Sequence, residues 1–174
     1  HPNVGLFYGL NMELNEHDQL IWEEELSDFV SERVFDAHIH MFSPEHMPQP
    51  ERAPWDLAGL DVLRRWATSL YNGRPTSFLA LGSPLPKIDV REHNKWCMQE
   101  IEGDAQSRFQ RLVTPACDVE DIYNDCQHSG VVGLKPYRIF SVTGDIKECR
   151  IHEFLPYEQL ELANDLGLWV TLHL

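Results

Sequence analysis

The first regular pattern along the chain is a helical one. Behind Asn15, a suitable N-cap, apolar residues recur at positions i, i+4, i+7 and i+8. These residues are Trp22, Leu26, Phe29 and Val30. The spacing predicts a helix that packs one stripe against the rest of the molecule. Residues 1–13 mix turn formers with apolar residues and predict no element, so we interpret residues 1–33 as an N-terminal segment with its helix.

Beyond residue 33, short apolar runs alternate with amphipathic stretches. The runs are typical of strands that are covered on both faces. They comprise residues 33–42, 76–86, 108–118, 131–140 and 168–174. The stretches that predict helices comprise residues 56–71, 87–101, 118–130 and 155–167. Strands that alternate with helices in this way predict an α/β fold with a parallel sheet.

Two parallel architectures suit this alternation. A (β/α)₈ TIM barrel needs about 250 residues, so five strands would be its first part. A doubly wound domain of five strands is the competing fold, although no Gly-rich phosphate loop follows the first strand. The chain ends inside the fifth expected strand. We therefore expect residues 34–174 to be the N-terminal five-stranded part of a barrel, truncated after strand 5.

Composition narrows the classes of partner. The formal net charge is −14 and the pI is near 4.9, so Coulomb repulsion opposes binding to nucleic acid or to an anionic membrane. No window approaches the roughly 20 apolar residues of a membrane span. The four cysteines form no CxxC pair, which favours free thiols in a reducing compartment, and we expect a cytoplasmic protein.

The stretch FDAHIHMF carries the first candidate chemistry. His38 and His40 are two residues apart, so a strand turns both imidazoles to one face, and both can reach a single ion. The alternative is a pair of hydrogen-bonded core imidazoles. Asp36 shares their face in a regular strand and would hydrogen-bond one of the metal-ligating imidazoles. His173 ends the fifth strand and would supply a third imidazole, unless it faces solvent.

The fourth strand adds a lysine. Alternation places Gly133, Lys135 and Tyr137 on one face. Lys135 would bind a substrate carboxylate, extend to solvent from the rim, or carry a carbamate that bridges two metals. Tyr137 is a weaker candidate for substrate binding.

The other polar residues are weaker candidates for a functional site. We expect solvated positions for His46, in the proline-rich loop 43–54, and for His93, on a helix. Asn94 falls in the apolar stripe of the same helix and is expected to bond neighbouring backbone.

Three stretches together resemble the amidohydrolase superfamily, in the branch of TIM-barrel metal-dependent hydrolases called amidohydrolase family 2 (amidohydrolase-related). They are FDAHIHMF, GVVGLKPYRIF and LPYEQLELANDLGLWVTLHL, and HNKWCMQEI and SRFQRLVTPACD between them are also similar. The resemblance runs from about Asn15 to Leu174. It implies a divalent metal, zinc or else manganese, held by His38, His40 and His173. It also implies an acid/base histidine and an aspartate beyond residue 174, so the catalytic groups are unknown here and the chain alone is expected to be inactive.

The resemblance implies a hydrolase, or a non-oxidative decarboxylase or other lyase, that acts on a small carboxylate-bearing compound. The alternative is a catalytically silent α/β scaffold or interaction module. A five-stranded slice of a barrel would expose its first and fifth strands as edges, so we expect it to aggregate or to pair with another chain, for example as a homo-oligomer.

Overall fold

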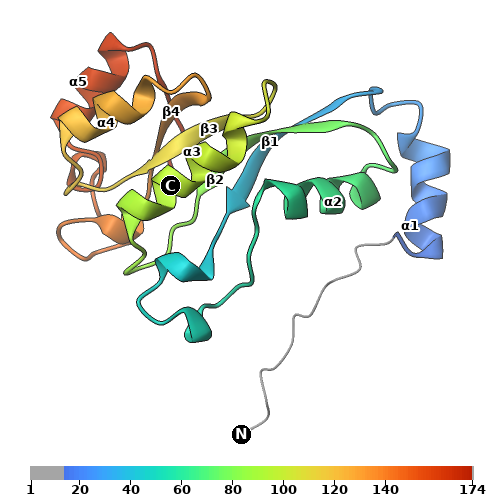
Figure 1. Cartoon of the computed structure of the whole chain (residues 1–174), viewed down its shortest axis with the longest axis horizontal. Coiled ribbons are helices and arrows are strands. Elements are labelled where there is room, and N and C mark those ends of the chain that lie inside the picture. Colours follow the sequence, from blue (N-terminus) through green and yellow to red (C-terminus); the bar gives the residue numbers. More distant parts are fainter. Residues whose placement is uncertain (1–13, 174) are drawn as a thin grey trace, which may run out of the picture.

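Residues 14–173 are described by a computed structural model, and residues 1–13, for which no element was predicted, lie outside this range. Five strands within it form one sheet (Figure 1). They are β1 (Val34–Met41), β2 (Thr76–Gly82), β3 (Arg108–Val113), β4 (Val131–Pro136) and β5 (Trp169–Val170). The α-helices are α1 (Glu16–Ile21), α2 (Leu60–Leu70), α3 (Val90–Glu102), α4 (Val119–Cys126) and α5 (Tyr157–Asp165). The 3₁₀ turns are η2 (Pro44–His46), η3 (Pro50–Arg52), η4 (Arg138–Phe140) and η5 (Ile151–Glu153).

The strand order follows the sequence. Each strand pairs in parallel with the next one along the chain, in the order β1-β2-β3-β4-β5. The predicted α/β fold with a parallel sheet is therefore confirmed. A doubly wound sheet reverses its strand order part-way, which this sheet does not do.

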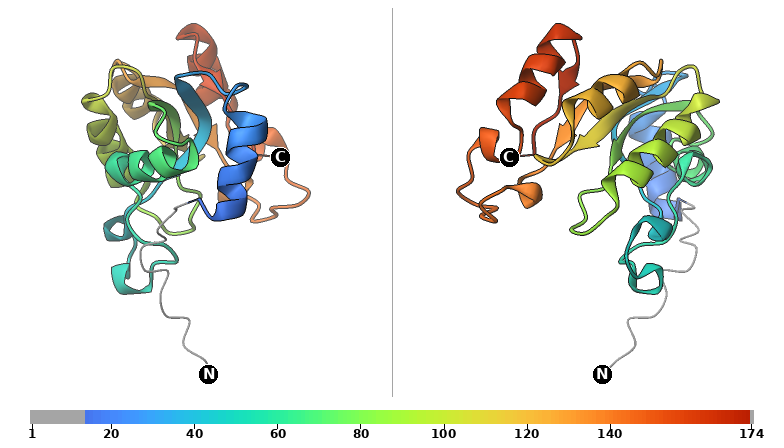
Figure 2. Two further views of the ribbon diagram at one scale, coloured as in Figure 1. Left: turned by 90° about the vertical axis from the view of Figure 1, so that its right-hand side faces the viewer. Right: turned by 60° about the vertical axis from the view of Figure 1, so that its left-hand side comes forward.

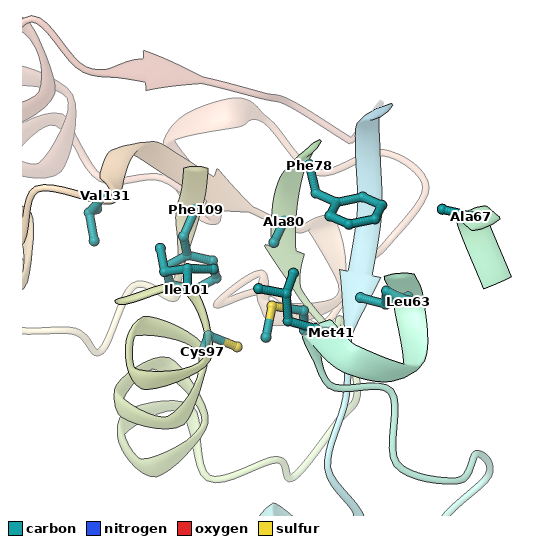
Figure 3. Close-up of a cluster of buried hydrophobic side chains, with 10 residues drawn as sticks. Met41, Leu63, Ala67, Phe78, Ala80, Cys97, Ile101, Phe109 and Val131 are labelled. Atoms are coloured by element: carbon teal, nitrogen blue, oxygen red, sulfur yellow. The ribbon is translucent and has the colours of Figure 1, made fainter. Parts of the chain in front are cut away.

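The helices that follow the strands pack on one face of the sheet. Phe109 and Val113 lie on the same face of β3, since they are four residues apart. Phe109 belongs to a core cluster that includes residues of α2 and α3, and Val113 to one that includes residues of α4 and α5. Figure 3 shows the first cluster, in which Met41, Phe78 and Phe109 meet Leu63 and Cys97. We call the opposite side of the sheet the site face.

Local chemistry explains several helix boundaries. The carboxylates of Asp89 and Asp118 accept hydrogen bonds from first-turn N–H groups of α3 and α4. Helix α2 begins at Leu60 rather than near residue 56, because Glu100 of α3 accepts the Leu60 N–H at 2.7 Å. A Cβ at Gly59 would lie 2.6 Å from the same Glu100 oxygen, so this remote cap depends on a glycine.

The N-terminal helix departs from its predicted stripe. A π-helical segment, η1 (Trp22–Leu26), follows α1 directly. Its wider turn changes the angle between successive side chains, so spacing taken from an α-helix no longer places residues on one face. Trp22 is buried, but Leu26 is 36% exposed and Phe29 is 84% exposed. The predicted core stripe was wrong for these two residues.

None of the helices in residues 14–173 combines the length and the apolar character needed to cross a lipid bilayer.

Candidate functional site

Strand register places one row of residues across the site face. In a parallel sheet, partners in register point to the same side. His40 pairs with Leu81, Leu81 with Gln110, and Gln110 with Gly133. Two residues further along β4 stands Lys135, and two beyond that Tyr137. His40, Lys135 and Tyr137 therefore share the site face, as alternation predicted.

A β-bulge in β1 changes the position of Asp36. Asp36 pairs with Phe78 and Ile39 with Ala80, so three steps on β1 oppose two on β2. The extra residue turns Asp36 to the helix-covered face, opposite His40, and the expected common face was wrong for it. Its carboxylate accepts the backbone N–H of His38 at 3.1 Å and lies 3.5 Å from the Tyr71 hydroxyl. Asp36 thus holds the backbone of the first histidine rather than an imidazole ring.

The three predicted histidines lie around Tyr137. The ring centroids of His38 and His40 are 5.2 Å apart, and Tyr137 lies 6.3 Å from the His40 ring and 5.7 Å from the His173 ring. His38 and His173 are exposed, and His40 is half-buried. The site face therefore gathers imidazoles from β1 and from the residues that follow β5.

Tyr137 fixes the tautomer of His40. Its hydroxyl donates to the Gly82 carbonyl oxygen at 3.0 Å and lies 3.3 Å from His40 Nδ1. Because the single hydroxyl proton goes to Gly82, the hydroxyl oxygen accepts from His40, which places the imidazole proton on Nδ1. The lone pair of His40 Nε2 is then left for another partner. Burial raises the pKa of Tyr137, which keeps the hydroxyl protonated.

Electrostatics keep the His38 and His40 imidazoles neutral. Burial is the main cause that lowers the pKa of His40, followed by the neighbouring His38. Burial and then the Lys135 ammonium lower the pKa of His38. Neutral imidazole is the form that binds a metal ion, so the local field favours ligands over protonated side chains.

Lys135 is buried beside the Tyr137 ring. The residue is 1% exposed, and its ammonium lies 5.0 Å from the centroid of the Tyr137 ring. Burial lowers its pKa. Within residues 14–173, no carboxylate forms an ion pair with it. An unpaired buried cation is a natural partner for an anionic group.

Gly133 lets β4 and β5 approach each other. A Cβ at this position would lie 2.2 Å from the carbonyl oxygen of Trp169 and 3.1 Å from the Gln110 side-chain nitrogen. No L side chain fits such contacts without movement of the backbone. The Gly-x-Lys pattern of β4 thus combines a packing requirement at residue 133 with a cation at residue 135.

The fifth strand is shorter than predicted. The ladder between β4 and β5 stops after Val170 and returns only as a bridge between Tyr137 and His173. Pro136 lies opposite the gap and has no N–H to donate, which explains the break. The bridge nevertheless holds His173 beside Tyr137.

These residues do not form a finished metal centre. Across residues 14–173, no three side chains of His, Cys, Asp or Glu are arranged to hold a metal ion as they stand. The donor chemistry nevertheless fits a divalent ion, because His40 has a preset tautomer with a free Nε2 and His38 and His173 carry further imidazole nitrogens.

Two histidines that we expected to be solvated are packed. His93 is fully buried on α3, and His46 in η2 is half-buried against it, with their Nδ1 atoms 3.1 Å apart. The burial of His93 could have been predicted from helical spacing, because His93 lies three residues after Val90 and four before Cys97, on the apolar face of the helix. Asn94, by contrast, bonds the backbone of Leu112 as predicted, because its side-chain amide donates to the Leu112 carbonyl oxygen and accepts from the Leu112 N–H.

Two surface hollows lie away from His38, His40 and His173. One, of about 460 Å³, is lined by Tyr157, Leu160 and Glu161 of α5, among others. Another, of about 420 Å³, lies between the N-terminal helical segment and the end of α2. We therefore base the candidate site on side-chain chemistry rather than on the size of a cavity.

No family model matches the chain, and comparisons with curated proteins and with solved structures found no match either.

Proposed function

We propose that this chain supplies the metal-binding rim of a metal-dependent hydrolase, or of a non-oxidative decarboxylase or other lyase, of the amidohydrolase type. The observation that carries the proposal is the Tyr137–His40 contact, which leaves His40 Nε2 free on the same face as the other imidazoles. A tyrosine that only filled space would not need to set a histidine tautomer.

His38, His40 and His173 would hold the ion. Three imidazole ligands suit zinc, and manganese is the alternative. The chemistry that such an ion supplies is polarisation of a water or substrate oxygen. Because the three nitrogens are not yet assembled around one point, binding would draw the exposed His38 and His173 side chains toward His40.

The chain's own residues have separate tasks. Tyr137 holds the proton on His40 Nδ1, so that the Nε2 lone pair stays available. Lys135 would bind the carboxylate of a small substrate, since it is a buried cation without a carboxylate partner in the described chain. Its burial also excludes water from that contact, which strengthens the attraction.

The proposal includes a barrel. A (β/α)₈ barrel uses parallel strands in sequential order, and β1 to β5 have both properties. The four cysteines are free, which suits a reducing compartment such as the cytoplasm.

A second candidate is a catalytically silent scaffold. The observation that favours it is the lack of an assembled three-donor set in residues 14–173. The two candidates differ in whether the protein binds a divalent metal stoichiometrically.

Metal content decides between them. The full-length protein would be loaded with zinc, dialysed exhaustively and measured by mass spectrometry, together with His38→Ala, His173→Ala and the matched control His17→Ala. His17 is an exposed residue of α1. We expect stoichiometric metal in the parent and the control, and loss of most of it in both site variants. Unchanged metal content in the two site variants would remove the proposal.

A further inference from the structure

The segment between β1 and α2 is held at two places. Phe42 and Ala58 form an antiparallel bridge that closes it at its base. Within it, the turn η2 is tied to α3, because the Asp89 N–H donates to the His46 carbonyl oxygen at 2.8 Å. Figures 1 and 2 show these turns, in cyan, at the end of the sheet to which the arrow of β1 points. This is the end at which Tyr137 and His40 meet.

A chain of hydrogen bonds sets the protons on two histidines. The backbone N–H of Ser83 donates to His93 Nε2 at 3.1 Å, so this nitrogen carries a lone pair and the proton of neutral His93 is on Nδ1. His93 Nδ1 lies 3.1 Å from His46 Nδ1 and therefore donates to it. His46 must then accept at Nδ1 and carry its own proton on Nε2.

The surroundings make the His46–His93 contact depend on neutral imidazoles. His93 is 0% exposed and packs beside Gly82, the thiol of Cys97 and the ring of Trp96. Burial lowers the pKa of His93 to about 3, and it raises the pKa of the Cys97 thiol, so both side chains are uncharged near neutral pH.

His46 faces more polar surroundings. The charged groups around it are Glu45 on its own turn and Asp89 and Glu92 at the start of α3, and the Trp96 ring lies 5.4 Å from its ring. Burial is the largest influence and lowers the pKa of His46 below its usual value, while the three carboxylates partly offset it by favouring the protonated imidazole. His46 is therefore the member of the pair that a moderate fall in pH protonates.

We propose that the His46–His93 pair is a pH-sensitive latch that holds the loop of residues 43–58 against α3 and opens when His46 is protonated. A protonated His46 presents an N–H to the His93 Nδ1–H. His93 cannot reverse its tautomer, because a proton on Nε2 would face the Ser83 N–H. Two donors then oppose each other at a distance that suited one hydrogen bond, and the contact is lost.

The latch is coupled to the candidate site through Met47. This residue follows His46 directly and packs against the cluster of Ile88, Leu112 and Tyr137. Release of η2 withdraws Met47 from the cluster that contains Tyr137, whose hydroxyl orients His40. Acid thus loosens the packing behind the site. The latch does not require that the site bind a metal, so the experiments that test it are independent of those that test the proposed function.

Amide hydrogen exchange of the full chain tests the opening. Rates for residues 43–58, divided by the intrinsic rates of free peptides, would be compared at about pH 7.5 and about pH 5.5. We expect exchange to accelerate by up to about tenfold, since opening gains one proton over that range. The variant His46→Asn keeps an acceptor oxygen near the position of Nδ1 but does not titrate, and its exchange should not change with pH. His46→Ala should exchange fast at both values.

Nitrogen chemical shifts of the two rings give a second, independent readout. At neutral pH we expect His93 protonated on Nδ1 only and His46 on Nε2 only. The opposite tautomer on either ring would overturn the proposal. So would the same acid acceleration in His46→Asn as in the parent, or exchange in the parent that does not change with pH. If His46→Ala does not fold, the parent and His46→Asn still decide.

Discussion

The hydroxyl of Tyr137, the residue that follows β4, connects β1 and β2, because it donates to the Gly82 carbonyl oxygen and accepts from His40 Nδ1. The residues that it joins are 55 and 97 positions away in the sequence. One side chain therefore fixes both the spacing at this end of the sheet and the orientation of an imidazole.

Tyr137→Phe removes that contact with little change of shape. We expect zinc affinity to fall by about 10- to 100-fold, the usual effect of losing a group that orients a metal ligand. Competition with a chelator of known affinity measures it. Tyr123→Phe on α4, where the ring is 45% exposed, is the matched control and should leave the affinity unchanged. Equal affinities for all three proteins would show that Tyr137 does not orient a ligand.

Gly133→Ala tests the close approach of β4 and β5. The new Cβ would collide with the Trp169 carbonyl oxygen, so we expect the free energy of unfolding to fall by about 1–3 kcal/mol. Urea denaturation measures it. Gly103→Ala is the control, because nothing lies within 4 Å of its added Cβ and its φ of −80° suits alanine. A Gly133→Ala protein as stable as this control would mean that the strands separate there at no cost.

Asp125→Ala leaves a buried charge without its partner. Arg111 Nε donates to Asp125 Oδ2 at 2.6 Å, and the two side chains are 4% and 28% exposed. We expect a loss of about 3 kcal/mol in the free energy of unfolding, at the low end for a broken buried pair because Asp125 retains some exposure. Adding Arg111→Met should recover much of this loss.

An exposed pair provides the comparison for Asp125. Asp61 contacts Arg64 but is 86% exposed, so Asp61→Ala should cost less than about 1 kcal/mol. Comparable losses from Asp61→Ala and Asp125→Ala would contradict the buried character of the Arg111 pair.

Acid should destabilise the fold through His93. Its pKa is about 3 in the folded protein against 6.5 for the free side chain, so the unfolded chain binds the extra proton. Its stabilising contribution is complete above pH 6.5 and is lost as the pH falls from there toward 3, by up to about 1.4 kcal/mol for each pH unit.

Measurements between about pH 6 and pH 4.5 avoid the titration of Asp104, and a His93 variant separates this effect from those of His38, His40 and His46, whose pKa values are also lowered. Asp104, whose pKa is lowered to about 2 by hydrogen bonds from Ser107, Gln106 and Arg64, loses its contribution only below 3.8. His93→Gln should show a smaller slope of unfolding free energy against pH than the parent. Parallel slopes would mean that His93 is not kept neutral by burial.

Much of the layered fold could be predicted because apolar residues recur with different spacings in strands and in helices. The order of elements from β1 to β5 follows those periods, and aspartate caps mark the starts of α3 and α4. The predicted N-terminal stripe was wrong because the wider turn of a π-helical segment replaces the α-helix at Trp22–Leu26, and the helical segment ends before Phe29. Leu26 and Phe29 therefore looked like core residues and are exposed.

The site was predictable in part for the same reason. Alternation placed His40, Lys135 and Tyr137 on one face, and the register of the sheet agrees. Asp36 was misplaced because a bulge depends on contacts with β2 and α2 rather than on the residues of β1 alone. The tautomer of His40 could not be predicted, since it depends on a hydroxyl 97 positions away.

Because the strands pair in sequence order, they can also pair one after another as the chain is synthesised. A ribosome adds about 5–20 residues per second, so β2 emerges and can dock on β1 seconds before β4 exists. The apolar layer beneath α2 and α3 is then assembled early, from neighbouring segments. Tyr137, which orients His40, is translated 97 positions after it, so a nascent chain forms this part of its sheet before the contact that sets the imidazole.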